Sequence, residues 1–276
     1  MLDILYEESH FLLIDKPSGM FSQSAPGIEN VQETLVRQLA ERDNHAGNPF
    51  IGLPHRLDRG TSGVMLLAKN QRALKRFGEQ FQSRKISKYY LAVCHGTLPS
   101  GVQTWTDYVR KIPEKPLAEI SSADVADARE ATLSAVCLGS TAEAARLNTD
   151  AGSSASSGRS SIALVELHTG RMHQIRIQFA SRGFPVVGDW SYGSEVRFGP
   201  LDGESLRQCF ALHALRIEIR HPQTGKLMAF TAGFPPLWST LSPEIVAAAE
   251  RIVACSRRTS DRAWLGVGAA VEQESN

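Results

Sequence analysis

The chain has little cysteine and no long apolar run. Four cysteines occur among its 276 residues, Cys94, Cys137, Cys209 and Cys255. They are widely separated and none forms a C-x-x-C pair, so the pattern predicts neither a zinc site nor a disulfide framework and indicates reduced thiols. No apolar stretch approaches the ~18 residues that a membrane-spanning helix needs. We therefore expect a protein without a membrane segment and without a bound metal.

Two further absences narrow the class of protein. The N-terminus begins with Asp3, Glu7 and Glu8 rather than with a basic and then apolar signal segment, which favours a cytoplasmic location. The G-x-x-x-x-G-K-[ST] pattern of phosphate-binding loops is missing, and Gly266 and Gly268 lie in a polar tail rather than between a strand and a helix. The sequence thus predicts no nucleotide cofactor.

Net charge is also small, and it is unevenly distributed. The 30 basic and 29 acidic residues give a formal net charge of +1, whereas many nucleic acid-binding domains are strongly basic. Between Lys69 and Lys88, however, Glu79 is the only acid among several cations. Such a run is either a solvated helix face or a local basic surface for a nucleic acid, and the sequence leaves both interpretations open. The cations of this run are Lys69, Arg72, Lys75, Arg76, Arg84, Lys85 and Lys88.

Hydrophobic patterning predicts an α+β fold with a mixed, mainly antiparallel sheet and flanking helices. Apolar residues at helical spacing predict one helix over 31–42 and another with Leu74, Phe77 and Phe81 as its core stripe. Strands are expected at 3–7, 11–15, 64–68, 89–94, 101–109, 131–138, 162–167, 210–219 and 227–231. In a short helix near residue 175, Ile175 and Phe179 share one face and Arg176 lies off it. Helices and strands do not alternate regularly, which argues against a doubly wound parallel sheet.

Two segments look additional to a main domain over residues 1–240. Residues 139–161 are rich in Ser, Ala, Gly and Thr, which predicts a flexible insertion at a hairpin tip. Residues 241–276 begin with Ser242 as a helix N-cap and Pro243 at the first helical position. This start predicts a docked helix to about Cys255, followed by a disordered tail.

The most informative stretch is HRLDRGTSG, residues 55–63. Asp58 lies between Arg56 and Arg59, and the turn formers at 60–63 lead into an apolar run. We therefore expect Asp58 on an exposed turn that feeds a strand. The flanking guanidiniums favour the ionised carboxylate, which suits a nucleophile or a base. The spacing alone fits a structural ion pair as well.

The sequence of this stretch resembles the signature of the RluA family of pseudouridine synthases, which isomerise uridine in structured RNA. Further segments in the family's order resemble its K-P-x-G turn, K-x-Y-x-A strand, T-G-R-x-H-Q-I-R segment, G-D-x-x-Y-G segment and closing hairpin. In the same order they are IDKPSGM at 14–20, KYYLAV at 88–93, TGRMHQIR at 169–176, GDWSYG at 188–193, and His213–Ala214 with His221–Pro222. The resemblance spans roughly residues 3 to 238.

The resemblance implies a pseudouridine synthase catalytic domain over residues 1–240 that needs neither cofactor nor metal. The catalytic residues that it implies are Asp58, Tyr90 (rather than Tyr89) and Arg176. The RNA contacts that it implies are Arg56, Arg59, Lys16 and Arg171. The expected supporting residues are His55, His173, Gln174, Asp189 and Tyr192. Asp189 and Tyr192 are expected to fix a loop beside the site.

The reaction accounts for these residue types. It breaks the bond between C1′ of ribose and N1 of uracil, turns the freed base and joins C1′ to C5. An ionised Asp58 can attack C1′, stabilise a cationic sugar or remove a ribose proton, and the three routes stay open. The resemblance pairs Arg176 with this carboxylate and places Tyr90 against uracil. A paired base must first be swung out, and Arg56 is expected to fill the space that it leaves.

Two other functions stay open. A non-catalytic RNA-binding protein would not need Asp58 among cations, because a carboxylate repels phosphate. A nucleoside or glycoside hydrolase would need a second carboxylate as its acid, for which Asp189 is the candidate. The expected partner is a stem-loop of ribosomal or transfer RNA, with the uridine positions and the oligomeric state unassigned. Family members of this size often have a small RNA-binding domain before the catalytic one. Here catalytic-type sequence begins at once, so we expect that domain to be missing.

Overall fold

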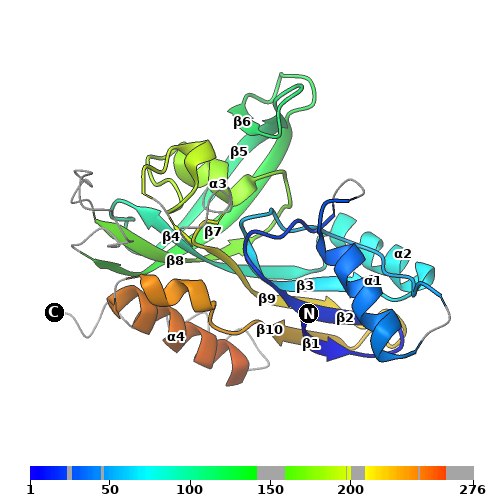
Figure 1. The fold of residues 1–276 in the computed structure, drawn as a ribbon. Helices are drawn as coiled ribbons and strands as arrows, with labels where there is room; N and C mark the ends of the chain where they lie inside the picture. The colour runs from blue at the N-terminus through cyan, green and yellow to red at the C-terminus, as the bar shows by residue number, and fades with distance from the viewer. Residues whose placement is uncertain are drawn as a thin grey trace. The chain divides into compact units, whose positions relative to one another are not determined.

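The computed structural model describes residues 1–23, 27–44, 47–141, 159–196, 198–199, 209–241 and 243–258. The chain divides into two compact units (Figure 1). Unit 1 consists of residues 1–88 and 214–233, and unit 2 of residues 89–213 and 234–276. No helix in the described part of the chain is long and apolar enough to cross a membrane.

Unit 1 contains a mainly antiparallel set of strands and two helices. Its elements are β1 (Asp3–Glu7), β2 (Phe11–Lys16), α1 (Val31–Arg42), β3 (Ser62–Ala68), α2 (Gln71–Gln82), β9 (Leu212–Arg220) and β10 (Leu227–Thr231). The strand order is β1, β2, β3, β9, and β10 pairs with β9. The β1–β2, β2–β3 and β9–β10 pairs are antiparallel. The first two residues of β9, Leu212 and His213, belong to unit 2.

The central strands of unit 1 are buried on both faces. All residues from Phe11 to Ile14 and from Val64 to Ala68 are buried, so both segments are continuous apolar runs rather than alternating ones. Residues 212–219 of β9 are also all buried, including the polar residues His213, Arg216 and Glu218. The ion pair between Arg216 and Glu218, 3.0 Å from Nε to Oε1, lies within this buried strand.

Both helices of unit 1 begin at an asparagine cap. The side chain of Asn30 accepts a hydrogen bond from the amide of Glu33, and that of Asn70 accepts one from Ala73. These caps satisfy amides that have no partner inside the helix. The cap at Asn30 explains why the predicted helix begins at Val31.

Of the expected apolar stripe of α2, one aromatic side chain packs fully into the core. Phe77 is fully buried and lies edge-on to Phe11, with 5.3 Å between the ring centroids. Leu74 and Phe81, expected in the same core stripe, are only half-buried. The expected stripe is therefore narrower than its sequence indicated.

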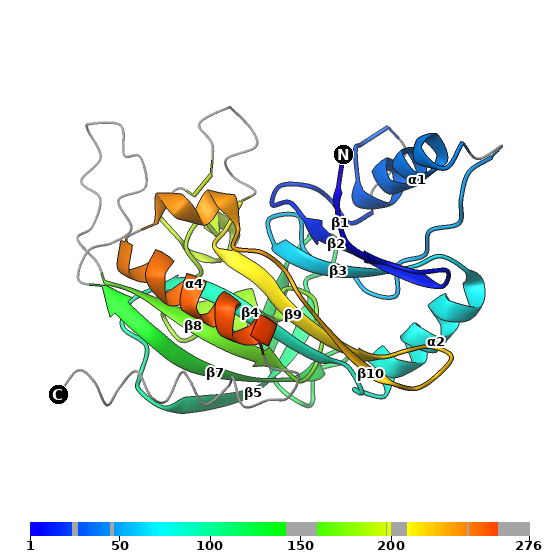
Figure 2. The same ribbon diagram turned by 90° about the horizontal axis from the view of Figure 1, so that it is seen from below.

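Unit 2 is a second antiparallel arrangement. Its elements are β4 (Ser87–His95), β5 (Val102–Lys111), β6 (Ala118–Ser121), β7 (Arg129–Thr141), β8 (Ser160–Leu167), α3 (Gln174–Ala180), η1 (Trp190–Tyr192), η3 (Pro236–Thr240) and α4 (Pro243–Arg258). The strand order is β4, β8, β7, β5, β6, and every neighbouring pair in it is antiparallel. The α4 helix packs against β7 and β8 (Figure 2) through the expected apolar face, which includes Ile245, Ala249 and Ile252.

The predicted α+β class is confirmed, and most of the predicted elements are present. The short strand β6 is an addition. The strands β7 and β8 pair up to Thr141 and Ser160, so residues 139–141 and 160–161, the two ends of the expected insertion, are strand residues. Residues 142–158, the N-cap candidate Ser242 and the tail after 258 lie outside the described residues. The division at residue 240 stays a prediction, and the helix that begins at Pro243 clusters with unit 2.

Candidate active site

Asp58 lies on a tight turn immediately before β3. The amide of Thr61 donates to the carbonyl of Asp58 at 3.0 Å, and the Asp58 residue is half-buried. Where β3 begins, Gly63 has φ 110, and a Cβ there would lie 2.3 Å from the carbonyl oxygen of Ala214. Only glycine fits this close approach. The position of the turn is therefore fixed by backbone packing within unit 1.

Lys16 anchors this turn from below. Its side chain is fully buried, and its Nζ donates to the carbonyls of Pro17 at 2.8 Å, Arg59 at 3.1 Å and Thr61 at 2.8 Å. An ammonium group has three donors, and a buried one needs partners for them. Lys16 therefore does not offer its charge to a phosphate, and its expected role as an RNA contact is corrected to that of a loop anchor.

The segment around the K-P-x-G turn supplies further supports. Ser18 Oγ donates to the carbonyl of Gly60 at 2.6 Å. Gly19 and Arg59 exchange two bonds, from the Gly19 amide to the Arg59 carbonyl and from Arg59 Nε to the Gly19 carbonyl, each at 2.8 Å. The Arg59 guanidinium also lies over the ring of Phe21, 4.6 Å from its centroid. Arg59 is thus partly used to hold the turn, while Arg56 is exposed.

Ser22 and His55 complete the frame of the turn. Ser22 Oγ donates to the carbonyl of Leu57 at 2.7 Å and accepts from its amide at 3.1 Å. His55 Nε2 accepts from the amide of Leu66 at 3.0 Å, and its ring stacks on Phe81 at 4.8 Å. Desolvation, followed by the charge of Lys88, lowers the pKa of His55 from 6.5 to about 3. A neutral His55 is required for this acceptor role, which fits a supporting residue.

In unit 2, Arg176 forms a buried bidentate ion pair with Asp189. Its Nε lies 2.6 Å from Oδ2 and its Nη2 lies 2.9 Å from Oδ1, with 5% and 1% of the two residues exposed. The guanidinium also lies over the rings of Tyr192 and Phe210, 4.9 Å and 4.4 Å from their centroids. We call these four residues the arginine clamp. Bidentate bonding and ring contacts offset the cost of burying the charge.

The clamp changes two expectations. Arg176 was expected off the buried face of its helix, but it is buried together with Ile175 and Phe179. Asp189, which accepts both guanidinium bonds, is occupied as an anion. It is therefore poorly suited to donate a proton as the second carboxylate of a hydrolase. The expected pairing of Arg176 with Asp58 would join the two units and stays a prediction.

Gln174 and His173 fasten the segment that leads into α3. Gln174 Oε1 accepts from Thr169 Oγ1 at 2.7 Å and from the Arg171 amide at 3.0 Å. Its Nε2 donates to the Thr132 carbonyl at 3.1 Å and to Gln178 Oε1 at 3.0 Å. His173, with φ 53, has Nδ1 2.9 Å from a tyrosine hydroxyl, that of Tyr192. These contacts are those of supporting residues.

Tyr192 ties the clamp to strand β6. Its hydroxyl accepts from the amide of Ala118 at 2.8 Å and lies 3.2 Å from the carbonyl of the same residue. Arg171, expected to contact RNA, is half-exposed and donates from Nε to the carbonyl of Glu130 at 2.8 Å. Each of these residues therefore has a structural contact of its own.

Tyr90 and its neighbour Tyr89 point to opposite faces of β4, as successive strand residues do. Tyr89 is completely buried, with its hydroxyl 3.5 Å from Glu166 Oε1. Tyr90 keeps 8% of its surface exposed. Both residues are in the buried core, and the choice of Tyr90 over Tyr89 as the functional tyrosine stays a prediction.

The sequence did not identify two of the supports, Ser22 and Phe210. Ser22 lies 35 residues from the Leu57 backbone that it bonds, and Phe210 was counted only as an apolar strand residue. Neither has a local pattern that marks it. Their roles depend on contacts that the fold creates.

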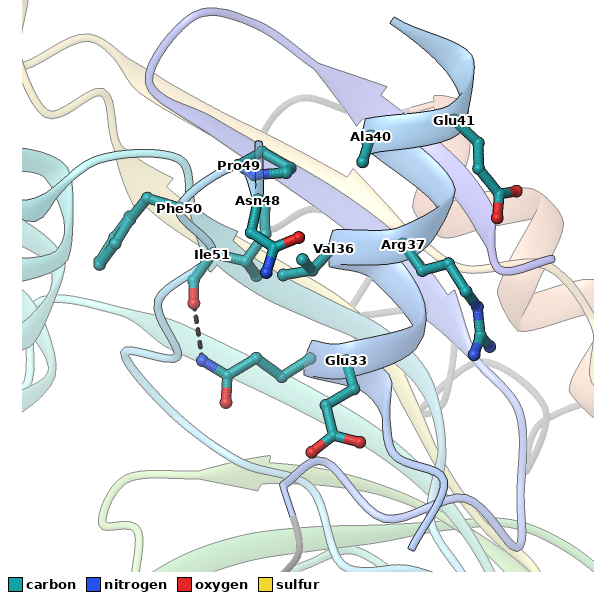
Figure 3. A pocket seen from close by; sticks show the side chains of 10 residues that line it. Glu33, Val36, Arg37, Ala40, Glu41, Asn48, Pro49, Phe50 and Ile51 are labelled. Carbon is teal, nitrogen blue, oxygen red and sulfur yellow. Dashed lines mark hydrogen bonds between the residues drawn. The ribbon is translucent and has the colours of Figure 1, made fainter. Parts of the chain in front are cut away.

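A pocket lies elsewhere in unit 1, on α1, and has a volume of about 620 Å³ (Figure 3). Its lining residues are Gln32, Glu33, Val36, Arg37, Ala40, Glu41, Asn48, Pro49, Phe50 and Ile51. A bond from Gln32 Nε2 to the carbonyl of Ile51, 2.7 Å, closes one side. None of the predicted site residues lines this pocket. We therefore do not connect it with the Asp58 turn.

Comparison with known proteins agrees with these motifs. A family profile described as RNA pseudouridylate synthase matches residues 10–181. The chain is 32% identical over 247 residues to ribosomal large subunit pseudouridine synthase D of Pseudomonas aeruginosa, covering 86% of this chain and 70% of that protein. It is 35% identical over 263 residues to the protein of the same name from Xanthomonas campestris pv. campestris, covering 90% and 72%.

A solved structure shares the fold. The human RNA pseudouridylate synthase domain containing 1 matches with a TM-score of 0.65 and 22% identity, covering 95% of this chain and 96% of that chain. The family profile and the bacterial relatives identify the type of enzyme. The chain belongs to the RNA pseudouridylate synthase family and is an isomerase that acts on RNA.

Proposed function

We propose that this isomerase converts specific uridines of large-subunit ribosomal RNA to pseudouridine and that Asp58 is its catalytic carboxylate. The observation that carries the proposal is a half-buried aspartate on a turn whose backbone is bonded by Lys16, Ser18 and Ser22. The names of the Pseudomonas and Xanthomonas relatives support ribosomal RNA as the substrate. Such a substrate implies a cytoplasmic enzyme. Transfer RNA is an outcome of the test below.

Asp58 acts on the sugar. Its carboxylate faces the developing positive charge at C1′ as the bond to N1 breaks and the electron pair passes to uracil. It then attacks C1′ to form an ester that C5 displaces, stabilises the cation until C5 bonds to C1′, or removes a ribose proton that it returns afterwards. Once C1′ has joined C5, the C5 proton leaves and N1 gains a proton, so the product has the same composition as uridine. All heavy atoms stay in the product, so the reaction needs no cofactor.

Tyr90 and Arg176 act with Asp58 in this proposal. The tyrosine ring stacks on uracil, and its hydroxyl lies near the C5 proton that is lost. The arginine keeps the catalytic carboxylate charged. The arginine clamp supports this role, because Asp189, Tyr192 and Phe210 fix the direction of the guanidinium. Asp189, Tyr192 and Phe210 are positioning residues.

The target uridine must leave the helix stack before C1′ can be reached. We assign Arg56 to the space that the base vacates, because its side chain is exposed two residues before Asp58 and a planar guanidinium stacks on neighbouring bases. Arg59 and Arg171 are assigned to phosphate groups nearby. Each donates from Nε to one backbone carbonyl, and a guanidinium has five N–H donors in all.

The experiment is to map pseudouridine in ribosomal and transfer RNA of a strain that lacks the gene. We expect specific sites in large-subunit ribosomal RNA to lose the modification and to regain it with the wild-type gene. Sites lost only from transfer RNA would move the substrate to that class. A strain that loses no site would contradict the proposal. With purified protein and an unmodified transcript, an isomerase leaves the mass unchanged, whereas a hydrolase releases uracil.

A further inference from the structure

One exposed face of α2 has a concentration of positive charge that the catalytic proposal does not use. Arg72, Lys75 and Arg76 are exposed, whereas Ala73 and Phe77 of the same helix are buried. Side chains three or four positions apart on a helix are neighbours, with about 5–6 Å between Cβ atoms. The three cations therefore form one continuous strip, which we call the α2 basic face.

These cations have no ion pair within the part of the chain that the structure describes. Elsewhere in unit 1, Arg42 and Lys69 both bond the carboxylate of Glu7. Unit 2 pairs Arg110 with Glu119 and Arg182 with Asp107 in the same way. On a protein of net charge +1, the α2 basic face is thus a local excess rather than part of a general positive field.

The distribution of charge along α2 also destabilises this helix. The first turn of α2 has no acid and its last turn has no cation, whereas helix dipoles favour acids first and cations last. Arg72 and Arg76 stand at i and i+4, where like charges destabilise a helix. Helix stability therefore does not explain this arrangement, and an external anion would remove the repulsion.

The α2 helix packs against the segment that leads into the Asp58 turn, within unit 1. Phe81 stacks on His55 with 4.8 Å between the ring centroids, and His55 precedes Asp58 by three residues. Near the other end of the helix, a Cβ on Gly52 would lie 2.8 Å from Leu74. An RNA strand held along α2 is therefore held on the same rigid unit as the proposed catalytic carboxylate.

We propose that the α2 basic face docks the phosphate backbone of the substrate RNA. This inference rests on the proposed function and adds to it a binding surface outside the reacting site. Phosphate is the anion that fits, because a strip of cations matches a regularly charged strand. An acidic protein partner is the alternative that the test separates.

The test compares Arg72→Gln/Lys75→Gln/Arg76→Gln with a scattered triple variant, Arg37→Gln/Lys226→Gln/Arg251→Gln. The control also removes three exposed cations, so both proteins have the same net charge. The substrate is an unmodified transcript of large-subunit ribosomal RNA. For the α2 variant we expect KM to rise roughly tenfold or more at low salt, and the slope of log KM against log salt to weaken by about 2, since each phosphate contact contributes roughly 0.7–0.9.

A second variant is expected to change KM in the opposite direction. Glu79 is the exposed acid on the same face, and Glu79→Gln should lower KM for the same RNA. The thermal unfolding midpoint of the α2 triple variant should stay level or rise, because a repulsion is removed. A purely structural role of these cations predicts a lower midpoint instead.

The outcomes separate this inference from the proposed function. If the wild-type protein forms pseudouridine and the α2 triple variant matches the scattered control, the α2 inference is wrong and the function stands. If the wild-type protein forms none, the proposed function fails, and direct RNA binding by the two triple variants still decides the surface. Retained RNA affinity with loss of an acidic protein partner overturns the RNA assignment.

Discussion

Two charged groups, Asp58 in unit 1 and Arg176 in unit 2, are held in different ways. The supports of Asp58 bond the backbone of its turn and lie beneath or beside it, as Lys16 and Ser22 do. Arg176 is instead held at the guanidinium itself, by both carboxylate oxygens of Asp189. The turn that presents Asp58, our proposed catalytic residue, is thus held through its main chain. A buried arginine needs its charge matched directly.

The comparison predicts the largest loss of stability in the clamp. Replacing Asp189 by Asn removes the carboxylate that accepts two bonds from the buried guanidinium, and breaking a buried ion pair in this way costs about 3–5 kcal/mol. We expect the free energy of unfolding to fall by this amount in urea denaturation. Asp127→Asn is the control, because Asp127 is exposed and 3.9 Å from Arg129. Equal stability of the two variants would contradict the clamp.

Replacing Lys16 by Met tests the anchor of the Asp58 turn. Three carbonyls lose a buried donor, and an unsatisfied buried group costs about 1–3 kcal/mol, so we expect a total of about 3 kcal/mol. Turnover should also fall at temperatures where the variant stays folded, because the turn loosens. The exposed Lys226→Met serves as control. An Lys16→Met protein as stable as this control would refute the anchoring role.

The pH dependence of stability tests the frame around His55. Its pKa is lowered from 6.5 to about 3 in the folded protein, so protons bind the unfolded chain first. The contribution of neutral His55 is complete above pH 6.5 and is lost as the pH falls towards 3, by about 1.4 kcal/mol per pH unit. His55→Gln keeps an acceptor for the Leu66 amide and should lose this slope. If the free energy of unfolding varies with pH in the same way in the wild-type protein and in His55→Gln, the lowered pKa of His55 is contradicted.

The smallest effects come from two hydroxyl deletions that compare the units directly. Ser22 Oγ and the Tyr192 hydroxyl each bond both backbone groups of one residue, Leu57 and Ala118. Ser22→Ala and Tyr192→Phe should each cost about 1–2 kcal/mol. Only Ser22→Ala should lower kcat several-fold, because its partner adjoins Asp58. If Tyr192→Phe lowers kcat more, the backbone route of positioning is not specific to unit 1.

What the sequence could predict was local. The spacing of Val31, Leu35 and Leu39 and the cap at Asn30 determine α1. The turn formers at 60–63 before an apolar run likewise located Asp58 on a turn. These features depend on residues within a few positions of each other, so propensity and periodicity are sufficient.

What the sequence could not predict depends on distant partners. Lys16 looked like a surface cation, but it is buried and donates hydrogen bonds to carbonyls 43 and 45 residues away. The bidentate partner of Arg176 is 13 residues along the chain, and Phe210 contacts the guanidinium only through the fold. A side chain's burial depends on tertiary packing, which no local pattern of a single sequence contains.

The most direct test of the account is single-turnover pseudouridine formation by purified Asp58→Asn, beside its equilibrium affinity for the same ribosomal RNA transcript. Asparagine keeps the shape of the side chain and removes the charge. We predict no measurable product and RNA binding at least as tight as wild type, because a charge that repels phosphate is gone. Product formed at the wild-type rate would show that the carboxylate on the anchored turn does not do the chemistry.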